Sequence, residues 1–204
     1  MPLRFNSKRK ETHRRRGIWS MRRQVLRTMA RVLVVAAVID SSLALQAAPD
    51  ARPENTIKAA FLFHFAEFVE WPEQALPANN SPLQVCAADE GLRDVLEASV
   101  AGKQVRTHPI QVRFTEGSDN LRGCHILYLG SIERRQMSAL LAAVKDTPVL
   151  TVGDSADFPK EGGMIGFLLQ NNKIRFDINL TAAQKANLKV SARLLILANS
   201  VIGG

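Results

Sequence analysis

Cys124-His125-Ile126-Leu127-Tyr128-Leu129 decides the fold, because it reads as a strand buried on both faces. A second apolar run, Pro148-Val149-Leu150-Thr151-Val152, follows it along the chain. The segment between them, about 132–144, is a predicted helix whose inward side chains are Met137, Leu140, Leu141 and Val144. Apolar strands that alternate with amphipathic helices are typical of a mainly parallel sheet with helices on both faces.

The same alternation extends toward the N-terminus. Leu83–Ala87 is a predicted strand, Gly91–Val100 a predicted helix and Ile110–Phe114 another strand. This order adds further strands to the same sheet. We therefore expect one α/β domain over 56–204, preceded by a polar linker at 49–55.

The C-terminal part of the chain has a different pattern. Met164–Leu169 and 174–178 flank Asn171-Asn172, and asparagine tolerates positive φ, so a two-residue β-hairpin is predicted. A short helix capped by Asn179 or Thr181 is expected next, and a last helix over about Ser191–Ile202. The complete expectation is a mainly parallel sheet followed by a C-terminal β-hairpin and helices.

Residues 57–70 form the first predicted helix, which Pro72 ends. Its broad apolar face, assigned to the core, contains Ile57, Phe61, Leu62, His64, Phe65, Phe68 and Val69. The opposite side contains Phe63 with Ala59, Glu67 and Glu70. An aromatic side chain among carboxylates indicates a partner contact, although packing under a neighbouring element explains it as well.

The N-terminal segment predicts export. Four arginines between Arg22 and Arg31 precede the apolar run Val32–Ile39, and small residues lead to Pro49. This order is typical of a secretory signal peptide over 1–48, and eight apolar residues are too few to cross a bilayer. The alternative is an uncleaved membrane anchor, and a start at Met21 would make residues 1–20 a start-site artefact.

Charge argues against a nucleic-acid partner. The net charge is +8, but eleven of the 27 Lys and Arg residues lie between Met1 and Arg31. From Pro49 onward, 16 basic residues face 17 acidic ones. A nucleic-acid-binding domain needs a basic folded surface, and this composition does not provide one.

The body of the chain contains two cysteines, Cys86 and Cys124. An oxidising compartment favours a disulfide between them, while two buried thiols are the alternative.

Motifs for chemistry are sparse. Gly162-Gly163 and Gly166 resemble a dinucleotide loop, but a predicted strand follows where that loop needs a helix. The histidines of the body show no zinc-site spacing, and a catalytic pair of a cysteine with His125 is disfavoured by the apolar strand context. We expect no enzyme activity, no cofactor and no metal.

One loop is a candidate site. It leaves the carboxyl end of an apolar strand, where open α/β sheets bind ligands, and contains Asp154, Ser155, Asp157 and Phe158. These side chains fit a small polar ligand or the backbone of a partner protein. A plain capped loop is the alternative.

Two parts of the sequence resemble the YfiR family. Residues 57–72, Ile57-Lys58-Ala59-Ala60-Phe61 through Trp71-Pro72, resemble its opening helix. Its C-terminal signature is similar to 162–167, 173–179 and 191–195, and the likeness runs over 54–201. Members commonly carry further cysteines near the Gly-Gly segment. Residues 157–161 contain none, so a second disulfide is not expected.

The resemblance implies a periplasmic α/β protein that often forms dimers. Its best-understood members bind the periplasmic sensor domain of an inner-membrane diguanylate cyclase and hold it inactive, which lowers cyclic di-GMP and biofilm formation. An outer-membrane lipoprotein that relieves repression is a further implied partner. We expect such a repressor here, with Phe63, Glu67, Glu70 and the 154–158 loop as contact surfaces. The alternative is a periplasmic small-ligand binding protein that reports to a membrane sensor such as a histidine kinase.

Overall fold

The structure is a computed structural model that describes residues 53–77, 80–115, 117, 121 and 123–203. The predicted signal peptide over 1–48 and most of the predicted linker lie outside the described residues. No helix within the described part of the chain is long and apolar enough to cross a membrane.

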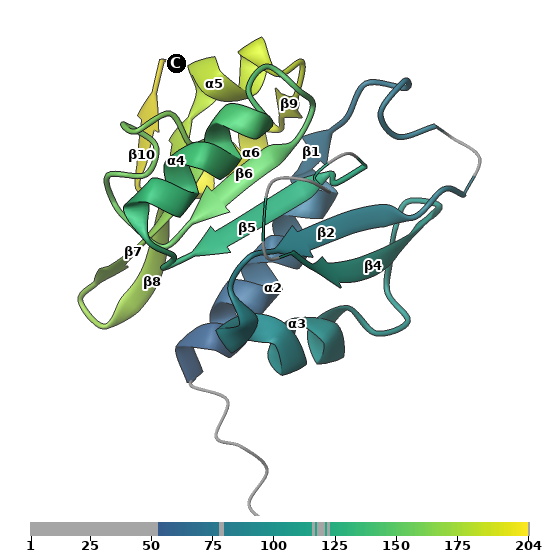
Figure 1. Cartoon of the computed structure of the whole chain (residues 1–204), viewed down its shortest axis with the longest axis horizontal. Helices are drawn as coiled ribbons and strands as arrows, with labels where there is room; N and C mark the ends of the chain where they lie inside the picture. The colour runs from purple at the N-terminus through teal and green to yellow at the C-terminus, as the bar shows by residue number, and fades with distance from the viewer. Residues whose placement is uncertain (1–52, 78–79, 116, 118–120, 122, 204) are drawn as a thin grey trace, which may run out of the picture. The chain divides into compact units, whose positions relative to one another are not determined.

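One sheet organises the described domain (Figure 1). Its strands are β2 Leu83–Ala87, β3 Gln104–Val105, β4 His108–Phe114, β5 Ile126–Gly130, β6 Leu150–Gly153, β7 Ile165–Gln170, β8 Lys173–Asn179 and β10 Ser200–Ile202. They are ordered β10-β8-β7-β6-β5-β2-β4-β3, and neighbours run parallel except in the pairs β7–β8 and β3–β4. The predicted mainly parallel α/β sheet is confirmed.

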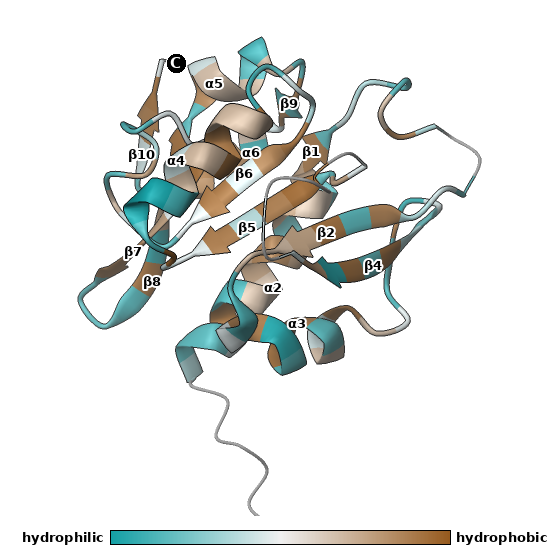
Figure 2. Ribbon diagram, viewed as in Figure 1, coloured by the Kyte–Doolittle hydropathy of each residue, from teal (hydrophilic) through white to brown (hydrophobic). Residues whose placement is uncertain are grey.

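Helices cover both faces of this sheet. They are α2 Pro53–Phe68, α3 Arg93–Val100 after the short η2 Glu90–Leu92, α4 Arg134–Ala143, α5 Leu180–Lys185 and α6 Ala192–Leu197. Figure 1 shows α4 on the near face, with α2 and α6 behind the strands. Side chains of β5 alternate between the two layers: Ile126 and Tyr128 join the core under α2, whereas Leu127 and Leu129 pack under α4. Figure 2 shows hydrophobic residues concentrated along these central strands.

The predicted hairpin is confirmed by β7 and β8. Asn171 and Asn172 connect the strands with φ of 51° and 57°, the left-handed values that a two-residue turn of this type requires. Its apolar residues Ile174, Phe176 and Ile178 face the α2 layer.

Both predicted end helices have different bounds in the structure. The first helix begins at Pro53, since proline suits the first helical position, and it ends at Phe68, where β1 Val69–Glu70 pairs with β9 Lys189–Val190. The last helix ends at Leu197, so its predicted extension to Ile202 is wrong. Residues 200–202 instead form β10, because β8 offers them a parallel backbone partner.

The predicted core face of the first helix is wrong in part. The His64 side chain is 53% exposed and Ile57 is 45% exposed, whereas Ala59 is completely buried. The helix packs against α3 as well as against the sheet. A wheel that assigns one apolar face cannot describe a helix covered on two sides.

The disulfide between Cys86 and Cys124 is confirmed, with 5.8 Å between the two Cα atoms. It ties β2 to the segment that leads into β5, on the α4 side of the sheet. The Arg113 guanidinium donates to both sulfurs, at 3.4 Å from Cys86 Sγ and 3.2 Å from Cys124 Sγ.

Replacing both cysteines with alanine is expected to lower the free energy of unfolding by about 3–4 kcal/mol, because the bridge closes a 38-residue separation. Urea denaturation of the oxidised protein and of the Cys86→Ala/Cys124→Ala variant measures this. Equal unfolding midpoints would contradict a stabilising role for the bridge.

A buried histidine fixes the loop that precedes β2. The His125 ring accepts a hydrogen bond from the Gln84 backbone N–H at Nδ1 (2.9 Å), and its Nε2–H donates to the Ala75 carbonyl (3.0 Å). The contact with Gln84 requires the neutral imidazole, because a protonated Nδ1 cannot accept a hydrogen bond. Burial lowers the pKa of His125, and the nearby His108 adds to this, while the hydrogen bond to Ala75 opposes it.

Stability is therefore expected to decrease with acidification. The unfolded chain takes up a proton near pH 6.5, whereas folded His125 resists it, so this contribution is complete above about pH 6.5 and is lost as the pH falls through the folded pKa. The measurement is the unfolding free energy from pH 7.5 to pH 5 for the wild type and His125→Gln. An equally steep loss in the variant would refute this role of the imidazole.

Candidate functional site

The candidate site lies where three neighbouring parallel strands end. Asp89 follows β2, Ser131 follows β5 and Asp154 follows β6, so all three residues meet at one edge of the sheet. The chain leaves β2 toward α3 on one face and β5 toward α4 on the other. This divergence is the switch point at which doubly wound sheets bind their ligands.

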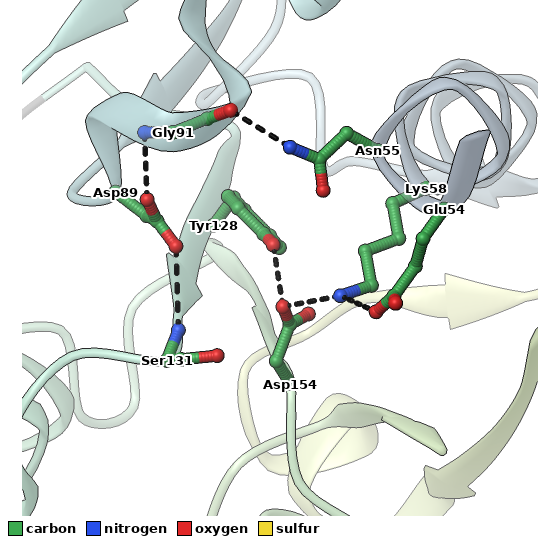
Figure 3. Close-up of polar contacts among 8 residues, drawn as sticks. All are labelled: Glu54, Asn55, Lys58, Asp89, Gly91, Tyr128, Ser131 and Asp154. Carbon is green, nitrogen blue, oxygen red and sulfur yellow. Dashed lines mark hydrogen bonds and ion pairs between the residues drawn. The ribbon is translucent and has the colours of Figure 1, made fainter. Parts of the chain in front are cut away.

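The first turns of α2 occupy this position (Figure 3). Lys58 Nζ lies 2.6 Å from Asp154 Oδ2 and 2.5 Å from Glu54 Oε1. Tyr128, in β5, donates its hydroxyl to the same Asp154 Oδ2 at 2.9 Å. The side chains of Lys58 and Asp154 are each only 8% exposed, so the ion pair is almost completely removed from water.

The electrostatics follow from this burial. Burial alone would lower the pKa of Lys58, but the hydrogen bonds to Asp154 and Glu54 outweigh it, so that the pKa is raised. Burial and the adjacent Asp154 carboxylate raise the pKa of Tyr128 far above its usual value. Lys58 is therefore a cation and Tyr128 a neutral donor throughout the physiological range, both directed at one carboxylate oxygen.

A second set of contacts joins the segments that follow β2 and β5 to the start of α2. Asp89 accepts hydrogen bonds from the backbone N–H of Gly91 (2.8 Å) and of Ser131 (3.4 Å), and Asn55 donates to the Gly91 carbonyl (2.8 Å). Gly130, at φ +57°, has no room for a Cβ because Asp89 lies against it. These contacts hold the start of α2 over the crevice.

This arrangement fills the site with the chain's own side chains. The Lys58 ammonium lies against Asp154 at this edge of the sheet, and Asp154 Oδ1 is buried without a hydrogen-bond partner among the described residues. No group of His, Cys, Asp and Glu within the described part of the chain is arranged to hold a metal ion. The geometry is suited to locking α2 onto the sheet.

The rest of the predicted 154–158 loop separates into exposed and buried residues. Ser155 Oγ accepts from the Asp157 backbone N–H (3.2 Å), and Asp157 forms an exposed ion pair with Lys160 (2.9 Å). Phe158 is completely buried and packs directly against Gly153 and Gly163, where a Cβ would collide with its ring. The structure therefore gives Phe158 a packing role, while Ser155 and Asp157 remain at the surface.

The other predicted contact residues lie toward the C-terminal end of α2. Phe63 is half-buried and Lys103 Nζ lies 4.5 Å from its ring centroid. Glu67 pairs with His64 at 2.8 Å, and Glu70 pairs with Arg106 at 3.1 Å. Glu67 and Glu70 line a common hollow of about 480 Å³ that Lys189 and Arg193 also line.

The predicted contact residues thus lie on two separate surfaces. Lys58 and Glu67 are nine residues apart on one helix, a rise of about 14 Å. The charged surface of Glu67, Glu70, Arg106, Lys189 and Arg193 lies at the C-terminal end of α2, and the 154–158 loop lies at its N-terminal end.

Comparison with known proteins identifies the family. A model of YfiR/HmsC-like proteins matches residues 55–199. The chain belongs to the YfiR/HmsC-like family. At the level of the family, membership supports a periplasmic regulator of a diguanylate cyclase, and members are regulators rather than enzymes.

Two solved structures show partial similarity. A conserved domain protein from Vibrio cholerae O1 biovar El Tor has 12% identity and a TM-score of 0.48, covering 70% of this chain and 60% of that one. An ABC domain from Streptococcus pneumoniae, in complex with L-Trp, has 9% identity and a TM-score of 0.48, covering 71% and 62%. This chain spans less than two thirds of either protein.

Lys58 and Tyr128 were not predicted as site residues. A lysine in an apolar helix face is normally assigned to solvent, and Tyr128 reads as an ordinary strand residue. Two features of the sequence could have indicated this pair. Lys58 interrupts the apolar face of its predicted helix, and Asp154 directly follows a predicted buried strand.

Lys58→Met is expected to lower the free energy of unfolding by about 3–5 kcal/mol, because it leaves the Asp154 carboxylate buried without its cation. Tyr128→Phe removes one hydrogen bond to a charged acceptor and is expected to cost less, about 1.5–3 kcal/mol. Urea denaturation measures both variants.

The Lys58→Met/Asp154→Leu double variant completes the test. It removes the uncompensated charge and is expected to be more stable than Lys58→Met alone. Additive losses from the two substitutions would show that the ion pair does not couple α2 to the sheet.

Proposed function

We propose that this protein is a periplasmic repressor that binds the sensor domain of an inner-membrane diguanylate cyclase, and thereby lowers cyclic di-GMP and biofilm formation. The family match over 55–199 is the observation that carries this proposal. An outer-membrane lipoprotein that relieves repression and a homodimeric state belong to the same proposal.

The filled switch point supports a role in binding rather than in catalysis. Ion pairs join Lys58 to Glu54 and Asp154 at the switch point, so these ionisable groups are paired with one another. A repressor needs only a higher affinity for the inactive state of its partner than for the active state. Such a role uses the outer surface of the domain.

The charged surface at the C-terminal end of α2 is the proposed contact for the cyclase. Its carboxylates and cations are exposed and lie around a hollow that admits a partner side chain. Half-buried Phe63 stacks beneath Lys103 one turn before Glu67, which gives the surface an apolar border. The exposed Ser155 and Asp157 are a second proposed contact at the opposite end of the helix.

The alternative is a protein that binds a small ligand and reports it to a membrane sensor. That ligand would have to bind somewhere other than the predicted site at the 154–158 loop. The switch-point crevice is closed by Asn55, Asp89 and Lys58. A ligand that acts there would first have to displace the start of α2.

Charge reversal tests the proposed contact. A strain that lacks this protein is expected to contain raised cyclic di-GMP, and the wild-type gene is expected to restore the low level. Glu67→Lys/Glu70→Lys is expected to fail in this restoration, because the surface then loses both carboxylates and carries only cations. Glu133→Lys is the matched control, since this exposed glutamate precedes α4 on the other face of the sheet.

Immunoblotting establishes that the variants accumulate to equal levels, and crosslinking to the membrane cyclase is measured in parallel. Normal repression by the Glu67→Lys/Glu70→Lys variant would remove this surface from the proposal. Unchanged cyclic di-GMP in the deletion strain would contradict the proposed function itself.

A further inference from the structure

A separate hollow of about 440 Å³ lies between the C-terminal end of α4, the helix α5 and the edge strand β10. Figure 1 shows these three elements close together at one end of the sheet. Thr151 lines the hollow near the start of β6, whereas Asp154 follows the end of the same strand. The hollow is therefore distinct from the switch point, and its volume falls within the range of small-molecule sites.

Apolar side chains form one part of the lining of this hollow, and the polar Thr151, Asn179 and Thr181 form another. Val144, which follows α4, and Met164, which precedes β7, are buried there, and Leu141 also lines the hollow. Ile202 of β10 lines the outer wall and is 37% exposed, one of the large apolar side chains that the described chain leaves in contact with water. Burial of hydrocarbon against these apolar side chains is favourable.

Two lysines line the same hollow. Lys145 follows α4 and Lys185 ends α5, and neither side chain makes an ion pair or hydrogen bond with another described residue. A lysine near a helix C-terminus is favoured by the helix dipole, which explains each position singly. It does not explain why both lysines line the same hollow as these apolar side chains. Asp146 is the carboxylate among the described lining residues, so the lining carries a net charge of about +1.

We propose that this hollow binds a medium-chain fatty acid, with its hydrocarbon chain against the apolar side chains and its carboxylate between Lys145 and Lys185. A lining of apolar side chains with two lysines selects a ligand that carries one anionic group at the end of an alkyl chain. Neutral alcohols lack the charge, and quaternary ammonium amphiphiles carry the wrong one. The inference is independent of the proposed repression, since binding is measured on the purified protein alone.

Calorimetric titration with octanoate and decanoate, below their micellar concentrations, tests the proposal. Saturable binding of one equivalent is expected, and affinity should rise about three- to fourfold for each added methylene until the hollow is full. Octyltrimethylammonium serves as the charge-reversed probe and is expected not to bind.

Variants locate the site. Lys145→Gln and Lys185→Gln are each expected to weaken decanoate binding about two- to fivefold, the range for partly exposed charge pairs. Ile202→Ser is expected to reduce the gain in affinity from octanoate to decanoate. Lys173→Gln, at the tip of the β7–β8 hairpin, is the matched control and is expected to bind like the wild type.

Unchanged thermal unfolding midpoints without ligand establish that the substitutions leave the fold intact. Three results overturn the proposal: no saturable binding of either fatty acid, equal decanoate affinity in the Lys145→Gln/Lys185→Gln variant, or equally tight binding of octyltrimethylammonium.

Discussion

The ion pair of Lys58 with Asp154 is the interaction on which the arrangement of this protein depends. Removing two charges from water costs several kcal/mol for each ion, and their attraction offsets this only with close geometry and further hydrogen bonds. Glu54 and the Tyr128 hydroxyl provide those bonds. The ion pair therefore fixes one end of α2 to the carboxyl edge of the sheet, at the point where β5 and β6 end.

Because of this ion pair, the doubly wound sheet does not have the ligand binding that is usually associated with its architecture. A doubly wound sheet offers a crevice at its switch point, and many proteins fill that crevice with a ligand. Here the chain fills it with its own lysine, so the fold retains a binding architecture without a vacant site at that edge. Membership of the YfiR/HmsC-like family agrees with a regulator, whose function depends on surfaces that contact other proteins.

The predictions from sequence were correct for elements whose apolar and polar residues follow a clear local pattern. Leu83–Ala87 was predicted with its observed bounds, and Asn171-Asn172 located the hairpin turn. The predictions were wrong where a tertiary neighbour decided the outcome. Ser200–Ile202 continued a helical pattern but pairs with β8, and His64 fell on the apolar side of a helix that α3 also covers. Local spacing carries no information about such neighbours.

The candidate site was located only in part for the same reason. The sequence placed Asp154 at the carboxyl end of a strand but did not identify Lys58, because the two residues are 96 positions apart. Phe158 was predicted as a contact residue of the loop, whereas its ring is buried in the core, where Gly153 and Gly163 leave room for it. A contact between residues this far apart in the sequence can be predicted only once the order of the strands in the sheet is known.

The most direct test of this account is a nitrogen-detected NMR titration of the Lys58 ammonium group. If Lys58 is locked to Asp154 and Glu54, its NH₃⁺ signal should be protected from exchange, and it should remain protonated above pH 10.5, where exposed lysines lose their protons. A Lys58 signal that exchanges as fast as those of surface lysines and titrates at or below pH 10.5 would contradict the account.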